Sequence, residues 1–209
     1  MTGGCYLEYI IPLVGVGTLA WLFLKSKKNG QGPAPAGSVY VDVDELIERS
    51  SINKTWSSST IPRTKGSERV SNAKITVNQW LTAGYPLGVA LAALTNADYE
   101  SRTSNYATGD SGNSFGLYQL HVRGAGKGMT ESQMRDPVQN TLAIMRDYAA
   151  GNGDPVDSAM RSGATLAQMA GLFGKYVERP ANPDVIELRA AYCRKLFPSI
   201  ANVPGKDLI

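Results

Sequence analysis

The chain has few of the residues that most often support nucleophilic or metal-assisted catalysis. Among its 209 residues are two cysteines, Cys5 and Cys193, and a single histidine, His121. Two such distant cysteines do not suggest a disulfide framework, and Cys193 fits a small core residue. The lone histidine argues against a Cys–His pair, and no residues have the spacing of a metal site or of a phosphate-binding glycine loop. We therefore expect a function without a metal or cofactor.

The chain also has no strong excess of one charge. Its 21 Lys and Arg against 18 Asp and Glu give a net charge of +3, and the basic residues are scattered. Neither a recognised nucleic-acid motif nor a basic cluster is present, so we do not expect nucleic acid as a partner. A mildly positive surface suits an anionic wall polymer, although many solvated surfaces share this property.

The stretch from Pro86 to Glu100 predicts a helix that ends in acids. Pro86 suits the first turn, and the apolar residues between positions 87 and 94 fall on one face. Asp98 and Glu100 stand at the C-terminal end, where the helix dipole disfavours negative charge. An acid at this place needs another reason, and a carboxyl held protonated near neutral pH for proton donation is one.

A polar, glycine-bearing segment, 103–114, follows and predicts a loop. Apolar and polar residues then alternate roughly from Phe115 to Val122, as in a short strand. A helix ending in an acid, a polar loop and a short hairpin would together build one wall of a groove.

The pair Glu100-Ser101, followed by Gly116-Leu117-Tyr118-Gln119, resembles the lytic transglycosylase and goose-type lysozyme superfamily. Virion-associated peptidoglycan-degrading domains of phages are especially similar, since many also carry a segment like 176–180. The resemblance covers about residues 78–198. It implies a mainly α, lysozyme-like domain with a short β-hairpin beside the groove. It also implies that Glu100 is the general acid/base and that the strand 116–119 lines the saccharide groove.

Further candidate residues surround Glu100 in this interpretation. Those expected to orient Glu100 or to contact the sugar are Ser101, Tyr106, Tyr118, Gln119 and Tyr176. Tyr118 fits a core aromatic equally well, and Tyr106 and Tyr176 are candidates for stacking or hydrogen bonding.

A second carboxylate is harder to assign, although the general glycosidase scheme needs two acids. Asp98 points to a different side of the helix from Glu100. Asp110 is a candidate for positioning water, or else an aspartate that caps its own turn. Glu178 either fixes a helix end or lies near the groove. Lytic transglycosylases need only one Glu, which protonates the glycosidic oxygen and then accepts the proton of the sugar's 6-hydroxyl as a 1,6-anhydro ring closes.

The sequence after the hairpin predicts short amphipathic helices sufficient for one small core. Thr130 with Gln133 is a capping-box pattern, and Asp136-Pro137 provides an N-cap and a proline at the first position. Thr165 begins another helix, and Asn182-Pro183 opens the last. The expected buried positions are 138, 142, 145 and 149, then 166, 169, 170 and 173, then 185, 188, 192 and 196.

The segment from Tyr9 to Leu24 is uncharged and almost wholly apolar. With flanking residues from 7 onward it approaches the length of a membrane helix, so we expect residues 1–28 to be a single-pass anchor in contact with a membrane through 7–24. A cleaved signal peptide is the alternative. Such signals begin with basic residues, however, and Glu8 is the only charged side chain among the first eight residues.

Residues 29–72 are rich in small and polar residues and predict a flexible linker. Within it, 39–44 alternates like a short strand or docking segment, and 50–72 reads as an extended tether with Trp56 as its large apolar residue. The catalytic domain is expected over 73–209.

These features predict peptidoglycan cleavage by an enzyme of a phage virion or virion membrane, acting at the bacterial envelope during genome entry. Three lysines after the apolar run favour a cytoplasmic position for that side in a bacterial membrane, where a wall enzyme would be useless. Packaging in a virion, with other virion proteins as partners, avoids this contradiction. The alternatives are a structural virion membrane protein whose lysozyme-like domain binds glycan or only packs, a hydrolytic lysozyme, and a bacterial envelope enzyme.

Overall fold

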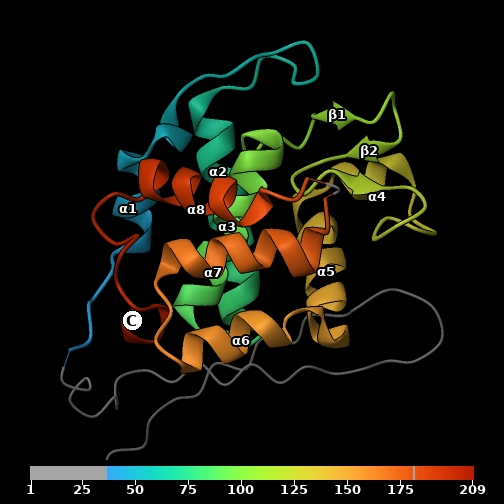
Figure 1. Ribbon diagram of the computed structural model, residues 1–209. Coiled ribbons are helices and arrows are strands. Elements are labelled where there is room, and N and C mark those ends of the chain that lie inside the picture. Colours follow the sequence, from blue (N-terminus) through green and yellow to red (C-terminus); the bar gives the residue numbers. More distant parts are fainter. Residues whose placement is uncertain (1–36, 181) are drawn as a thin grey trace, which may run out of the picture. The chain divides into compact units, whose positions relative to one another are not determined.

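A buried helix, α3 (Leu87–Ser101), is the central element of the fold. Its sequence to Ala97 is dominated by alanine and leucine, which favour helix and pack closely. In the computed structural model, which describes residues 37–180 and 182–209, α3 packs against α2 (Gly66–Thr82), α7 (Leu166–Phe173) and α8 (Val185–Leu196). Figure 1 shows α7 and α8 side by side, with α3 behind them.

The other elements complete a mainly α-helical unit with a small antiparallel sheet in the order β1-β2-β3. They are α1 (Val43–Arg49), η1 (Ser51–Asn53), β1 (Thr108–Gly109), β2 (Ser114–Phe115), β3 (Leu120–His121), α4 (Glu131–Arg135), α5 (Pro137–Asp147), η2 (Tyr148–Asn152), α6 (Asp154–Arg161), η3 (Gly174–Glu178) and η4 (Gly205–Asp207). The expectation of an α-rich domain with a short hairpin is confirmed at this level.

The predicted helix starts are confirmed where a local side-chain cap defines them. Thr130 and Gln133 form a capping box at α4, and the Asp136 side chain accepts from the Gln139 amide at the start of α5. Thr165 caps α7 in a second capping box. These signals depend on residues three positions apart, so the sequence alone is enough to find them.

The predicted buried stripes are confirmed for α7 and partly wrong for α5 and α8. In α7 the predicted residues 166, 169, 170 and 173 are all buried. In α5, however, Asn140 and Thr141 are buried, and Ala149, which lies in the following η2, is exposed; in α8 Arg189 is buried while Leu188 is exposed. Counting apolar residues misplaces these faces because each contains a polar side chain that is buried with its hydrogen-bond partners.

The expectation of a linker over 29–72 is wrong for its described part, because the compact unit begins at Gly37. Val39 forms a parallel bridge with Leu208, as the docking interpretation of 39–44 allowed. Ile47 and Ile52 are fully buried, so they anchor the segment to the core. A catalytic-domain boundary at residue 73 would cut α2 and is also wrong.

The predicted anchor, residues 1–28 with its apolar segment 7–24, lies outside the described residues. Within 37–180 and 182–209, none of the helices has the length and apolar character needed to cross a bilayer.

The predicted strand from Phe115 to Val122 is instead a tight hairpin. Strands β2 and β3 pair on either side of a turn at 116–119. Gly116 has a φ of 78°, and a Cβ there would collide with the Met134 carbonyl oxygen and the Asn140 amide. A glycine is therefore required at the start of the turn, and alternation of side chains alone does not reveal this requirement.

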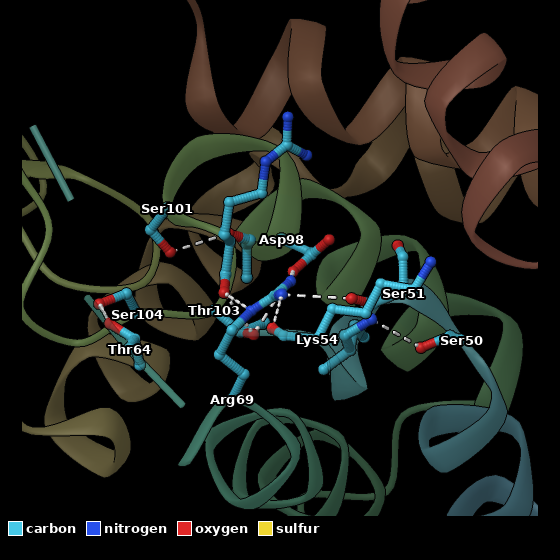
Figure 2. Close-up of polar contacts among 12 residues, drawn as sticks. Ser50, Ser51, Lys54, Thr64, Arg69, Asp98, Ser101, Thr103 and Ser104 are labelled. Carbon is cyan, nitrogen blue, oxygen red and sulfur yellow. Dashed lines mark hydrogen bonds and ion pairs between the residues drawn. The ribbon is translucent and has the colours of Figure 1, made fainter. Parts of the chain in front are cut away.

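A buried ion pair between Arg69 of α2 and Asp98 of α3 fixes the end of the central helix (Figure 2). Arg69 Nη2 lies 2.8 Å from Asp98 Oδ1, and both side chains are at most 1% exposed. The remaining nitrogens of Arg69 donate to the carbonyl oxygens of Ser51, Lys54 and Arg102. The pair therefore connects η1 and Lys54 with α2 and with the residues that follow α3.

The same network holds an unfavourable backbone conformation. Arg102 and Thr103 follow α3 with φ values of 57° and 52°, in the left-handed region that non-glycine residues rarely adopt. Arg69 binds the Arg102 carbonyl, and the Thr103 hydroxyl is 3.4 Å from Asp98 Oδ1. The last turn of α3, which carries Glu100, is therefore fixed on both of its sides.

We expect Asp98→Asn to destabilise the protein by about 3–5 kcal/mol, because it leaves the buried Arg69 charge uncompensated. Denaturant unfolding of the full chain measures this change. Lys74→Ala is the matched control: its ion pairs with Asp44 and Glu48 are solvent-exposed, so their loss should change stability little. Equal small effects of the two substitutions would contradict the role given to Asp98.

Candidate functional site

Two glutamates share one buried arginine at the C-terminal end of α3. Arg189 Nη2 donates to Glu100 Oε1, and the same nitrogen is 3.1 Å from Glu178 Oε2. The three residues come from α3, η3 and α8, so the tertiary fold brings them together. Glu100 and Glu178 are thus the two sequence-predicted acids that the structure places at one site.

The two carboxyl groups differ in their exposure to solvent. The Glu100 side chain is 27% exposed, whereas those of Glu178 and Arg189 are 6% and 2% exposed. A polymer approaching from solvent would therefore meet Glu100, with Arg189 and Glu178 behind it. This order leaves Glu100 as the carboxyl group that a molecule from solvent can reach.

Glu178 is the carboxyl of the pair that is held away from water. Burial, and secondly the charge of Glu100, raise the pKa of Glu178 well above its usual value, and the opposing effect of Arg189 is smaller. Glu178 therefore keeps its proton to a higher pH than an exposed glutamate does. Among the described residues, Glu178 Oε1 and Arg189 Nε and Nη1 are buried without a hydrogen-bond partner.

A π-helical turn, η3, positions Glu178. This turn extends α7 and ends at Arg179, which has a φ of 55°. It begins with Gly174, where a Cβ would lie 2.8 Å from Arg189 Cγ and 2.9 Å from Asn96 Oδ1. Only glycine allows η3 to come this close to α3 and α8. Single π-turns of this kind are frequent at functional sites.

Aromatic rings hold the guanidinium of Arg189 from another side. Its Cζ lies 3.7 Å from the centroid of the Tyr99 ring, and Tyr99 packs edge-on against Tyr192 at 5.2 Å. Such a cation–π contact favours a charged, flat guanidinium in one orientation. Arg189 is therefore fixed before any ligand binds.

The hairpin turn is fixed by a buried amide. Asn140 donates to the carbonyl oxygens of Phe115 and Met134, and it accepts from the Tyr118 amide at 3.0 Å. The Gln119 side chain donates to the Gly116 carbonyl at 2.9 Å. These bonds hold the Gly-Leu-Tyr-Gln turn without any ligand.

The remaining predicted site residues have different surroundings. Ser101 is fully buried and donates to the Ala97 carbonyl, so its hydroxyl is used within the helix. Tyr118 is buried and stacked on Phe173, and burial raises the pKa of its phenol. Tyr106 and Tyr176 are exposed and available to a ligand.

Asp110 is part of a turn. Its backbone has a φ of 48°, its carboxylate accepts from the Ser114 hydroxyl, and its carbonyl accepts from the Asn113 amide side chain. These contacts match the interpretation of Asp110 as an aspartate that caps its own loop.

Arg189 is the residue of this candidate site that the sequence did not predict. It lies one helical turn after Val185 and one before Cys193, on the buried face of α8. An arginine inside an apolar stripe is the available signal, since a buried arginine needs a partner of opposite charge. Within the described residues, no three His, Cys, Asp or Glu side chains gather in a way that would hold a metal ion.

Comparisons with protein-family models, with curated proteins and with solved structures found no match.

We expect Glu178 to make stability depend on pH. Its raised pKa means that its contribution is complete below about pH 4.3, the usual pKa of Glu, and is lost as pH rises through the folded-state pKa. Glu178→Gln does not titrate, so its melting temperature should gain on that of the parent as pH rises from about 4.

Thermal unfolding of the full chain across this pH range measures the difference. Glu131→Gln, which changes an exposed acid paired with Arg135, is the control and should keep a constant offset from the parent. A constant offset for Glu178→Gln as well would rule out a native-state proton on Glu178.

Proposed function

We propose that the chain cleaves the glycosidic bond between MurNAc and GlcNAc in peptidoglycan, with Glu100 as the general acid/base. The observation that carries this proposal is the partly exposed Glu100 at the end of a buried helix, joined to Glu178 through Arg189. The Glu-Ser and Gly-Leu-Tyr-Gln segments add the resemblance to lytic transglycosylases and lysozymes.

The shared arginine suits a residue that must both give and take a proton. In the first step Glu100 donates its proton to the glycosidic oxygen and becomes a carboxylate, while the bond from that oxygen to the MurNAc anomeric carbon breaks and GlcNAc leaves with the protonated oxygen as its hydroxyl. Arg189, which donates to Glu100, stabilises this carboxylate as it forms. Glu178 accepts from the same Arg189 nitrogen, so one guanidinium is shared between the two carboxyl groups.

The second step in our proposal uses the sugar's own hydroxyl. The Glu100 carboxylate accepts the proton of the MurNAc 6-hydroxyl. The oxygen of that hydroxyl bonds to the anomeric carbon of the same sugar, and a 1,6-anhydro ring closes. Asp110 is engaged by Ser114, and Glu178 is buried behind Arg189, so neither is well placed to activate water. This arrangement favours a lytic transglycosylase over a two-carboxylate hydrolytic lysozyme.

One observation favours a different function. An acid that is already paired with a buried arginine also fits a purely structural role, in which the domain binds glycan or packs within a particle without cleaving. The chain would then be a structural virion membrane protein.

The setting that we propose is a phage virion or virion membrane, where the enzyme opens the wall locally during genome entry. This part rests on the apolar segment 7–24, the lysines that follow it and the resemblance to virion domains.

We expect Glu100→Gln to lower the rate of soluble-fragment release from purified sacculi by about 10²–10⁴-fold, because glutamine has no proton to donate. Full chains are compared in detergent, with unchanged circular dichroism as the condition for interpreting the rate. Glu131→Gln should retain the parental rate, because this acid is exposed at the start of α4 and pairs with Arg135. Parental activity of Glu100→Gln would exclude Glu100 as the acid.

A further inference from the structure

A continuous row of aromatic rings and guanidinium groups leads from the protein surface to Glu100. The Arg102 Cζ lies 4.9 Å from the Trp56 ring and 4.9 Å from the Tyr192 ring. Tyr192 packs against Tyr99 at 5.2 Å, and Tyr99 lies 3.7 Å from the Cζ of Arg189. We call these five residues the aromatic row. Its inner end, Arg189, binds Glu100 directly.

The outer part of the row is rigid. Trp56 exchanges two backbone hydrogen bonds with Thr64, at 3.0 and 2.9 Å, and the Thr64 hydroxyl is 2.7 Å from that of Ser104. Arg102 Nη1 donates to the Tyr192 hydroxyl, which donates to the buried Asp98. The ring and the guanidinium are therefore held in place without a ligand, which lowers the entropic cost of binding one.

The outer end is nevertheless open to solvent. Trp56 is 41% exposed although its backbone is fixed, and Arg102 and Tyr192 are only partly buried. Within the described residues, the side chain of Arg102 makes one hydrogen bond, through Nη1, so most of its donors are free for a ligand. A large ring beside an arginine with free donors provides both an apolar face and a site for an anion.

We propose that Trp56 and Arg102 form a subsite that binds the glycan strand away from the bond that is cleaved. The subsite rests on the proposed function, because it takes the same polymer. The Trp56 ring stacks on the C–H face of an amino sugar, and Arg102 binds the carboxylate of a lactyl group or of the attached peptide. The row connects this subsite to Glu100, and its positive charge matches the anionic strand.

This assignment explains why the Trp56 segment is part of the folded unit. Sequence composition predicts a tether there, yet the structure places Trp56 beside the residue that follows the catalytic turn of α3. Binding at a distance from the reacting bond would hold a long strand in place, so we expect the subsite to act mainly on KM for long strands and to leave kcat unchanged.

The test measures binding of uncrosslinked peptidoglycan glycan strands to the full chain carrying Glu100→Gln, by calorimetric titration. Adding Trp56→Ala should weaken binding about tenfold, because one aromatic contact is lost. Trp56→Phe, which keeps a smaller ring, should restore part of the affinity. Tyr40→Ala is the matched control, since Tyr40 is an 81% exposed aromatic outside the row and should have no effect.

The ligand itself provides a second comparison. A chitin oligosaccharide of equal length lacks the carboxylates of free lactyl groups and of attached peptides, and it should bind more weakly than the peptidoglycan strand because Arg102 loses its anion. Equal affinities of the two ligands would overturn the role of Arg102. Unchanged affinity in Trp56→Ala would overturn the role of Trp56.

The outcome also separates this proposal from the proposed function. Normal cleavage by Glu100→Gln together with weaker binding by Trp56→Ala would refute the catalytic assignment and retain the subsite. A catalytically inactive Glu100→Gln together with unchanged binding in Trp56→Ala would do the reverse. Failure of the strand to bind at all would overturn the subsite.

Discussion

The buried ion pair between Arg69 and Asp98 is the interaction on which the candidate site depends. Burying this pair removes two charges from water, which costs free energy. Further hydrogen bonds offset that cost, because Arg69 also donates to backbone carbonyls and Asp98 also accepts from the Tyr192 hydroxyl. Through these bonds the pair connects four elements: η1, α2, the end of α3 and α8. Glu100 lies two residues after Asp98, so its place is set by a network that it does not join.

The two buried arginines differ in the number of acidic side chains that they bind. Arg69 faces a single acid, Asp98, which is fully buried and fully bonded. Arg189 faces two acids, and one of them, Glu100, reaches solvent. One carboxylate balances the charge of Arg69, whereas two carboxyl groups share the single charge of Arg189, and the pKa of one of them, Glu178, is raised. The second arrangement suits acid/base chemistry.

Local signals in the sequence predicted the local structure well. The capping boxes at Thr130 and Thr165 and the N-cap at Asp136 depend on neighbours a few residues away, and the structure confirms them. The high helix content and the end of α3 near Glu100 were also predictable, because the spacing of apolar residues within each helix is a local signal.

What the sequence could not predict depends on distant partners. Arg189 is buried because it binds Glu100, and Asn140 is buried because it binds the hairpin turn. A pattern of apolar residues does not predict such polar side chains on a buried face. The predicted linker, 29–72, is polar in composition, but in its described part Ile47, Ile52 and the contacts of Arg69 connect the chain to the core. Asp110 was the best sequence candidate for positioning water, but the fold engages Asp110 with Ser114 and brings Glu178 to Arg189.

The most direct measurement of the central claim is mass analysis of the products that the full chain forms from purified sacculi. One-acid cleavage by Glu100 predicts soluble fragments that end in 1,6-anhydro sugars, about 18 mass units lighter than hydrolysed ends because no water enters the bond. Fragments with hydrolysed ends would require a second group that activates water. Glycan strands of unchanged length would contradict the account, because the site around Glu100 would then cleave nothing in the wall.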